Sequence, residues 1–416
     1  MNEFYDQLET RSSDERATAQ LAALRAQLSH VTHNTTAYAD RFREIDVDSI
    51  TDLEAFSRIP LTRKSELIAL QVERRPFGGY TSQNGQQPSH VFASPGPIYE
   101  PGFAVSDFWR FARSLYASGF RSGERVHNCF SYHLTPAGQM FDSAAQALGC
   151  IVIPAGVGQT ELQVQTIADL APSGYVGTPS FLKIILDQAD ALGSDVSCIN
   201  KAMVSGEALP GPLRDGFSER GLRVQQCYGT ADLGLIAYES NALEGLIIDE
   251  GVYLEIVRPG TGEPVAAGEV GEVVVTNLGA EYPLIRFATG DLSASLSGIS
   301  PCGRTNLRIR GWMGRADQTA KVRGMFIHPE QVDKVIKRHG EIQRARLVVD
   351  WVEQADRMTL QCECTASGIA ASDSALTTAI EESIRSICKL RGAVDIVAPG
   401  SLPNDGKVID DIRQYD

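Results

Sequence analysis

The chain has 416 residues, with 38 lysines and arginines against 52 aspartates and glutamates, which gives a formal net charge of −14. Its length predicts two or three folded domains, and its negative charge argues against nonspecific nucleic-acid binding and against a basic membrane-surface patch. No apolar run approaches the ~20 residues needed to span a bilayer, and the first residues lack a basic and then apolar leader, so we expect a cytoplasmic protein.

Eight cysteines are spread along the chain, and only Cys362 and Cys364 lie close together. A zinc site needs two close pairs or a mixed Cys/His set, and disulfide frameworks belong to small secreted chains. The seven histidines show no metal-ligand spacing either. We therefore expect reduced, structural thiols and no zinc held by the protein.

The first half of the chain predicts helices and then an alternation of helices and strands. Residues 14–31 place alanine and leucine at helical spacing after a capping serine, and a shorter helix is expected over 49–57. From about 101 to 212 we expect strands at 126–130, 150–154 and 174–177 and helices at 140–148, 160–170 and 181–192. This alternation predicts a parallel sheet with both faces covered, and ligands bound beyond the carboxyl ends of its strands.

The second half of the chain is richer in strands. Strands are expected over 251–257 and 271–276, and beyond residue 316 the expected elements are a strand, a helix, two strands and a helix (319–322, 329–339, 344–349, 358–364 and 374–390). We therefore predict an α/β fold. Its large N-terminal domain, residues 1–316, has mostly parallel sheets covered by helices plus a β-rich subdomain, and a small α+β domain follows over residues 317–416.

Two segments at expected strand ends combine glycine with a carboxylate. In Tyr228-Gly229-Thr230-Ala231-Asp232 the ring can stack on a base, the glycine lets backbone approach a ligand, and the carboxylate can hold a hard cation such as Mg²⁺. In Thr289-Gly290-Asp291 the carboxylate can accept two hydrogen bonds from ribose hydroxyls. Each segment has a simpler interpretation, a glycine turn beside a buried tyrosine for the first and a capping or turn aspartate for the second.

Two further segments carry basic residues near the expected end of each domain. Gly314-Arg315-Ala316-Asp317, followed by Lys321-Val322-Arg323-Gly324, is either a solvated linker or a hinge that presents Arg315 to an anion. Gly406-Lys407 places a lysine on a Pro/Gly turn, where it is either solvent-exposed or a mobile positive charge for an anionic intermediate.

Taken together and in this order, the four segments resemble the adenylate-forming enzymes, and more narrowly the phenylacetate–coenzyme A ligase family. Further segments that fit this family are Ile59–Leu67, Pro76-Phe77-Gly78, Gly158–Glu161, Thr178-Pro179-Ser180, Pro301–Thr305 and Ile327-His328-Pro329. The resemblance spans nearly the whole chain. It implies a ligase that uses ATP to convert a small carboxylate, aryl or short acyl, to an acyl-adenylate and then to its coenzyme A thioester, with a rotating C-terminal domain.

The resemblance also implies roles for individual residues. It assigns Ser205, Gly206, Glu207, Tyr228 and Gly229 to adenine, Thr230 to the nucleotide, and the loop residues Ser94 and Gly96 to phosphate. It assigns Asp291 to the ribose hydroxyls and Arg315 to the ribose or phosphate side. It makes Asp317 the hinge and places Lys321 and Gly324 on the nucleotide and coenzyme A side. It makes Lys407 the catalytic lysine and Asp232 a catalytic, Mg²⁺-binding carboxylate, with Phe130, Tyr132, His133 and Val204 lining the acyl pocket. Members of this family are often homodimers.

The sequence departs from the family pattern in three places that the family uses to bind the phosphates of ATP. The phosphate loop falls on residues 93–101, where one glycine remains, no lysine is present and Glu100 would repel phosphate. Ala231 replaces a hydroxyl residue, and Asp232 replaces a glutamate whose carboxylate reaches about 1.5 Å further. An arginine expected after Lys407 is missing, and Asp410 and Asp411 stand nearby. Two alternatives therefore stay open, an acyl transferase that needs no ATP and a non-catalytic homologue that binds acyl groups or nucleotides.

Overall fold

The computed structural model describes residues 3–94, 98–316, 320–323, 325–352, 355–364, 374–403, 405 and 407–413, without the side chains of 321, 325, 326, 330, 351, 352 and 355. The chain forms two compact units. Unit 1 comprises Met1–Leu254, Val274–Ala288 and Ser295–Trp312, and unit 2 comprises Glu255–Val273, Thr289–Ala294 and Met313–Asp416.

Unit 1 begins with helices, of which α1 (Ser13–Asn34) is the longest. The Ser12 side chain and Glu15 form a capping box that starts α1, so the helix expected over 14–31 is confirmed and extends three residues further. The single helix expected over 49–57 is wrong. A 3₁₀ turn η2 (Val47–Ser49) is followed by α3 (Leu53–Ser57), because the Asp52 carboxylate accepts the Ala55 amide at 2.7 Å and starts a new helix there. The short 3₁₀ helix η1 (Gln7–Thr10), α2 (Thr36–Arg41) and α4 (Lys64–Glu73) complete this region.

The centre of unit 1 is a parallel sheet with strand order β8-β7-β6-β4-β5. Its strands are β4 (Arg125–Asn128), β5 (Ile151–Ile153), β6 (Gly174–Gly177), β7 (Lys201–Val204) and β8 (Arg223–Thr230). The helices that connect and cover them are α5 (Ala112–Ala117), α6 (Ala137–Ala147), α7 (Thr160–Leu170), α8 (Pro179–Leu192) and α9 (Gly211–Glu219).

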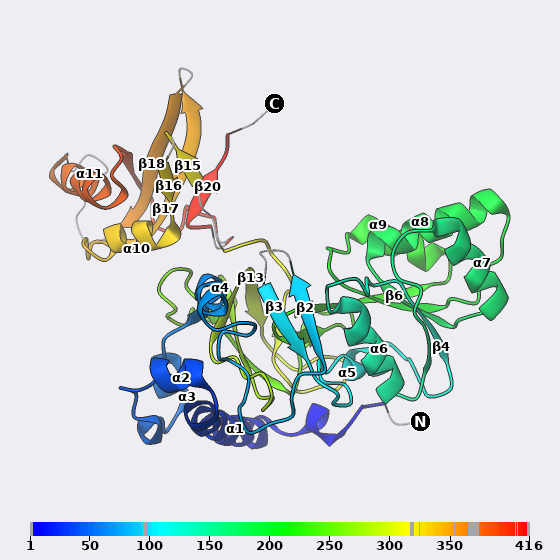
Figure 1. The fold of residues 1–416 in the computed structure, drawn as a ribbon. Coiled ribbons are helices and arrows are strands. Elements are labelled where there is room, and N and C mark those ends of the chain that lie inside the picture. Colours follow the sequence, from blue (N-terminus) through cyan, green and yellow to red (C-terminus); the bar gives the residue numbers. More distant parts are fainter. Residues whose placement is uncertain are drawn as a thin grey trace. The chain divides into compact units, whose positions relative to one another are not determined.

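Alternate residues of these strands pack against different helices. Tyr175 and Ala202 belong to the core cluster formed with α7, α8 and α9, whereas their neighbours Val176 and Met203 belong to the cluster formed with α5 and α6. A period of two along a strand directs neighbouring side chains to opposite faces. The expected parallel sheet with both faces covered is therefore confirmed, and Figure 1 shows the two layers of helices on either side of β6.

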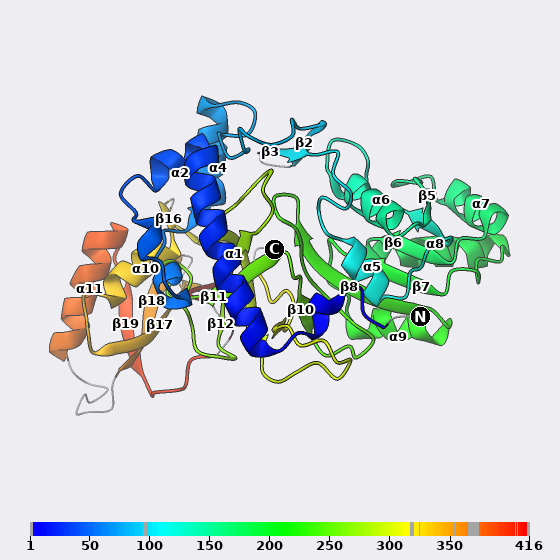
Figure 2. The ribbon, with the colours of Figure 1, turned by 90° about the horizontal axis from the view of Figure 1, so that it is seen from below.

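The sheet continues beyond β8 with antiparallel strands in the order β9-β10-β14-β13-β12-β11, and β1 (Thr62–Arg63) pairs with β13. These strands are β9 (Gly234–Tyr238), β10 (Leu246–Ile248), β11 (Val252–Val257), β12 (Val270–Asn277), β13 (Phe287–Leu296) and β14 (Arg308–Ile309). Helix α1 runs beside this part of the sheet (Figure 2), and its Gln27 amide donates to the Asn277 carbonyl at 2.8 Å. A separate hairpin joins β2 (His90–Ser94) and β3 (Ile98–Gly102), with Phe92 opposite Glu100.

The C-terminal part of unit 2 is a small α+β structure, as expected. Its four-stranded sheet has the order β19-β18-β17-β20, and β15 and β16 form a hairpin. The elements are β15 (Ala320–Val322), β16 (Met325–Ile327), α10 (Pro329–Ile336), β17 (Ile342–Val352), β18 (Ala355–Cys364), α11 (Ser374–Cys388), β19 (Ala393–Val397) and β20 (Ile409–Asp411). Apolar residues of α10, α11, β17 and β18 share one core cluster.

Candidate functional site

Two of the expected nucleotide-binding segments lie side by side at the carboxyl ends of β7 and β8. Ser205 directly follows β7, and its hydroxyl donates to the Cys227 carbonyl at 2.9 Å. Gly206 adopts a φ of +82°, and the Glu207 carboxylate accepts the Ser180 amide at 3.4 Å. Because β7 and β8 are parallel neighbours, Ser205–Glu207 and Tyr228–Thr230 share one edge of the sheet, which is where doubly wound α/β sheets bind ligands.

Close packing explains why residue 229 is a glycine. A Cβ atom added there would lie 2.6 Å from the Gly234 carbonyl oxygen and 2.9 Å from the Phe111 ring, so the β8–β9 hairpin leaves no room for a side chain. The Thr230 hydroxyl accepts the Leu233 amide at 3.1 Å and thereby orders the turn that follows β8. This turn fixes the position of Asp232.

Asp232 lies in a buried group of polar side chains. Its side chain is 1% exposed, and Oδ2 accepts a hydrogen bond from the Lys64 ammonium at 3.1 Å, at the start of α4. Glu100 on β3 is also buried, and the charge of Asp232 acts on it. Burial raises the pKa of Glu100 to about 8, with a further contribution from the Asp232 charge, while Ser94 and Lys64 favour the ionised form. Ser94, an expected phosphate-loop residue, is therefore next to Glu100, and Gly96 lies outside the described residues.

The four residues expected to line an acyl pocket are not gathered in one place. Phe130 stacks on Phe141 with ring centroids 4.5 Å apart, in the cluster formed with α5 and α6. Val204 is buried in the other cluster, with α7, α8 and α9. His133 is exposed in the loop that follows β4.

The Tyr132 hydroxyl is held by two residues that the sequence interpretation did not select. It donates to the Asp142 carboxylate at 2.9 Å and accepts from the Asn128 amide at 2.8 Å. Burial, followed by the hydrogen bond to Asp142, raises the pKa of Tyr132. The sequence signal for this arrangement is weak, because Asn128 ends β4 and Asp142 lies on α6, ten residues after the tyrosine.

In unit 2, Asp291 and Arg315 contact each other directly. Asp291 lies on β13, and Arg315 pairs with it in an antiparallel bridge. The Arg315 guanidinium donates to Asp291 Oδ1 at 3.2 Å and is half exposed, whereas Asp291 is largely buried. The two residues that the resemblance assigns to the ribose and phosphate side are thus adjacent, with one face of the arginine open to solvent.

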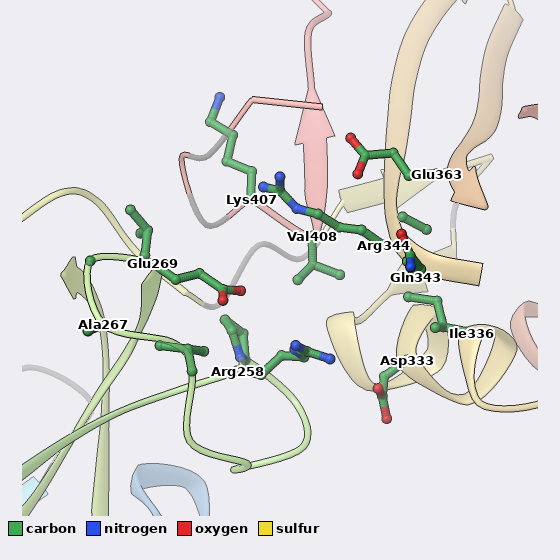
Figure 3. Close-up of a pocket in the computed structure, with 15 residues that line it drawn as sticks. Arg258, Ala267, Glu269, Asp333, Ile336, Gln343, Arg344, Glu363, Lys407 and Val408 are labelled. Atoms are coloured by element: carbon green, nitrogen blue, oxygen red, sulfur yellow. The ribbon is translucent and has the colours of Figure 1, made fainter. Parts of the chain in front are cut away.

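Lys407 borders a cavity of about 670 Å³ within unit 2, whose lining includes Arg258, Glu269, Asp333 and Arg344 (Figure 3). The Lys407 side chain extends away from Arg258 and Asp333 in this view, and its ammonium donates to Asp410 Oδ1 at 2.7 Å. Three acidic and three basic side chains line the cavity, so its charge alone selects no ligand.

Besides Gly96, three expected site residues receive no geometric test. Asp317 and Gly324 lie outside the described residues, and for Lys321 the structure describes the backbone in β15 but not the side chain.

Comparison with known proteins identifies the class of enzyme to which this fold belongs. Residues 132–280 match the family "AMP-binding enzyme", and residues 324–412 match "AMP-binding enzyme C-terminal domain". The solved structure of a 2-hydroxyisobutyryl-CoA ligase, in an open conformation with 2-HIB-AMP and CoA, superposes with a TM-score of 0.73 at 23% identity. This match covers 97% of the present chain and 92% of the other. The fold is therefore that of the adenylate-forming enzymes, as expected from the sequence.

The family follows from sequence relatives. The chain is 31% identical to a phenylacetate-coenzyme A ligase of Pseudomonas putida over 86% of this chain and 85% of that protein. It is 30% identical to the Aromatoleum evansii enzyme of the same name over 86% and 83% of the two chains. The chain belongs to the phenylacetate–coenzyme A ligase family, and the resemblance drawn from its motifs is confirmed. Among the helices in the described part of the chain, none is both long and apolar enough to cross a membrane.

Proposed function

We propose that this protein is an ATP-dependent ligase that converts a small carboxylic acid to its coenzyme A thioester. In the first step a carboxylate oxygen attacks the α-phosphorus of ATP, the bond to the β-phosphate oxygen breaks, and pyrophosphate leaves. In the second step the thiol of coenzyme A loses its proton, its sulfur attacks the acyl carbon, and AMP leaves. The observation that carries the proposal is the gathering of Ser205–Glu207 and Tyr228–Asp232 at one strand edge in a chain of this family.

Individual residues receive roles within this proposal. Ser205–Glu207 and Tyr228 frame adenine, and the Asp291–Arg315 pair, already in contact at 3.2 Å, receives the ribose and its phosphate. Lys407 stabilises negative charge at the carboxylate and α-phosphate. The chain divides functionally into residues 1–316 and a C-terminal domain of residues 317–416, whose rotation about Asp317 brings Gly324 to the coenzyme A. A cytoplasmic homodimer is part of the same proposal.

Asp232 fits a role in holding Mg²⁺. Its Oδ1 atom is buried and has no hydrogen-bond partner among the described residues, so one carboxylate oxygen is available to a ligand. Mg²⁺ takes oxygen ligands and is commonly held by one or two carboxylates together with substrate phosphates. When bound, the ion would offset the negative charge of the triphosphate.

The substrate class is a small aromatic or short acyl carboxylate. The Tyr132 ring, partly exposed just after the carboxyl end of β4, offers aromatic surface, whereas the stacked pair Phe130–Phe141 is buried in the core. Hydrogen bonds to Asn128 and Asp142 hold the Tyr132 ring in one orientation, which limits its adaptation to a long flexible chain.

The test is pyrophosphate release by the purified chain with ATP, Mg²⁺, coenzyme A and a panel of aryl and short-chain acids. Lys407→Ala should lower adenylation ~10²–10³-fold, since it removes a positive charge at the reacting groups. Thioester formation from a supplied acyl-adenylate should change little. Lys183→Ala is the matched control, because Lys183 is also an exposed, ion-paired lysine, and its activity should be unchanged. Equal adenylation by the wild-type protein and Lys407→Ala would contradict the role of Lys407.

A second function, acyl transfer without ATP, is favoured by one observation. Glu100 and Asp232 place two buried acids where the triphosphate would bind, and Lys64 pairs with Asp232. The wild-type protein distinguishes the two functions. Thioester formation from a synthetic acyl-adenylate, with no pyrophosphate released from ATP by any acid of the panel, would support the transferase and reject the ligase.

A further inference from the structure

Arginines of β17 hold the part of the chain that carries Lys407. Lys407 lies just before β20, which pairs in parallel with β17. We call the described residues between 402 and 410 the lysine segment. Arg344 and Arg346 lie on the same face of β17, because side chains along a strand alternate between its two faces. Arg344 donates to the carbonyls of residues 402 and 403 in the lysine segment, at 3.1 and 2.6 Å.

A buried arginine contacts carboxylates on both sides of Lys407. The Arg346 side chain is 5% exposed and pairs with Asp405 and, at 3.3 Å, with Asp410. The Asp405 carboxylate also accepts the Lys407 backbone amide at 3.1 Å, and the Asp410 carboxylate accepts the Lys407 ammonium at 2.7 Å. Arg346 is therefore linked to the main chain of Lys407 through one carboxylate and to its ammonium through the other.

The contacts made by the arginine and by the lysine differ in strength. The planar guanidinium of Arg346 binds the two carboxylates through different terminal nitrogens, and breaking such a buried pair leaves an unpaired charge in the interior. The Lys407 side chain is 46% exposed, and an exposed ion pair such as the one it forms with Asp410 contributes little to stability. The carboxylates are thus fixed, whereas the ammonium can exchange its partner.

The charge around Lys407 also depends on Arg346. Two carboxylates flank the lysine, and the guanidinium offsets one of their two negative charges. Without the guanidinium, both carboxylates would attract the ammonium more strongly. The ammonium would have to overcome this attraction before it could stabilise negative charge on a substrate. Arg346 therefore both fixes the backbone at Lys407 and makes its ammonium easier to release.

We propose that Arg346 is a positioning residue for Lys407 in adenylation. Through Asp405 it fixes the backbone at the lysine. Through Asp410 it gives the ammonium a resting partner, which the ammonium exchanges for the substrate carboxylate and the α-phosphate. This inference rests on the role of Lys407 in the proposed ligase reaction.

The first experiment measures the two half-reactions separately. Arg346→Gln should lower adenylation roughly 10-fold because Lys407 loses its fixed position, while thioester formation from a supplied acyl-adenylate should change less than 2-fold. Adding Asp410→Asn to Arg346→Gln should restore adenylation several-fold, because loss of that negative charge releases the ammonium. A purely structural role predicts the opposite, a double variant that is slower than Arg346→Gln. Arg346→Lys keeps the positive charge and should lose less activity.

Hydrogen–deuterium exchange measures how firmly the lysine segment is held without any nucleotide. In Arg346→Gln its amides should exchange faster than in the wild type. Arg413→Gln is the matched control, because the Arg413 side chain is 3% exposed and also pairs with two carboxylates, Asp356 at 2.6 Å and Asp411 at 2.5 Å. It should lower the temperature of thermal unfolding as Arg346→Gln does, and leave the ratio of the two half-reaction rates unchanged.

The inference is overturned if the lysine segment exchanges equally fast in Arg346→Gln and the wild type. It is equally overturned if Arg346→Gln and Arg413→Gln slow both half-reactions alike, or if the double variant adenylates more slowly than Arg346→Gln. Failure of the proposed function gives a different result, because the wild-type protein would then release no pyrophosphate with any acid of the panel. The exchange measurement would still decide whether Arg346 holds the lysine segment.

Discussion

At the scale of single residues, the contact between Gly290 and Arg315 determines how Asp291 is presented. Gly290 has a φ of +75°, and a Cβ atom placed there would lie 2.7 Å from a terminal nitrogen of the Arg315 guanidinium. The same guanidinium donates to Asp291 Oδ1 at 3.2 Å. The glycine thus permits both the backbone conformation and the close approach of the arginine that bridges to Asp291.

The variant Gly290→Ala should separate the effect of the backbone conformation on stability from the effect of the Arg315 contact on nucleotide binding. We expect a loss of about 1–2 kcal/mol in unfolding free energy from the left-handed conformation, and a roughly 10-fold weaker AMP affinity as Arg315 is displaced. Chemical denaturation and calorimetry measure the two quantities. Gly298→Ala is the control, since its φ is +79° but the nearest atom to its Cβ, on Arg308, is 4.0 Å away. It should lose similar stability and bind AMP normally. If both variants bind AMP equally, Arg315 does not contribute to this site.

The sequence predicted part of the candidate site at this scale and could not predict the rest. Asp291 and Arg315 were each selected from local motifs, and the structure places them in contact. Glu100 was expected in a phosphate loop, and its burial on β3 could not be recognised from the sequence. Its pKa depends partly on the charge of Asp232, more than a hundred residues away in the chain, and no local pattern predicts such an interaction.

At the scale of secondary structure, the β8–β9 hairpin depends on close backbone packing at Gly229. Gly229→Ala would force a Cβ atom to within 2.6 Å of the Gly234 carbonyl oxygen, which belongs to backbone and cannot rotate away. We expect a loss of about 1–3 kcal/mol in unfolding free energy, measured by urea denaturation. Gly216→Ala in α9, with nothing within 4 Å of its added Cβ, should instead gain about 0.5–1 kcal/mol. A Gly229→Ala protein as stable as the wild type would show that the hairpin can relax.

Helices and strands with a clear periodic pattern of apolar residues were predicted with the most accurate bounds. Helix α7 and strand β6 have the bounds expected from the sequence, because each is a continuous apolar-patterned segment between turn residues. The hairpin β2–β3 and strands β19 and β20 were not predicted. Each has five residues or fewer, and pairing with a partner strand defines it more than its own sequence does. Helix α10 ends at Ile336, three residues before the expected end.

At the scale of the whole chain, the N-terminal segment is bound to unit 1 by a network of buried charges. Glu9 accepts a hydrogen bond from the Tyr238 hydroxyl at 2.8 Å and pairs with Arg304 at 3.1 Å and Arg113 at 3.3 Å. Arg113 also pairs with Asp249 at 3.4 Å. Because the partners come from segments as far apart as residues 9 and 304, local sequence patterns could not predict the network.

Asp107, whose carboxyl is influenced by the charge of Asp249 from this network, makes the stability of the protein depend on pH. Burial, opposed by hydrogen bonds from the Ala112 and Phe111 amides and reinforced by the Asp249 charge, raises the pKa of Asp107 to about 7, against an ordinary value of 3.8. A carboxyl whose pKa is raised by folding favours the folded state below pH 3.8, and this contribution is lost as the pH rises through 7. Above that pH, folding must place a charged carboxylate in a partly buried position.

Asp107→Asn keeps an acceptor for the Ala112 amide, whose nitrogen lies 3.0 Å from Oδ2 of Asp107, and removes the titration. The stability of this variant relative to the wild type should therefore be higher at pH 8 than at pH 5, as measured by urea denaturation at both values.

Asp6→Asn is the informative comparison. Burial alone would raise the pKa of Asp6, but its hydrogen bonds with Arg113 outweigh burial and lower the pKa. Asp6 thus stabilises the folded state above its ordinary pKa, and Asp6→Asn should cost stability at both pH 5 and pH 8. If the stability difference between Asp107→Asn and the wild type is the same at pH 5 and pH 8, the Asp107 carboxyl does not resist ionisation in the folded protein.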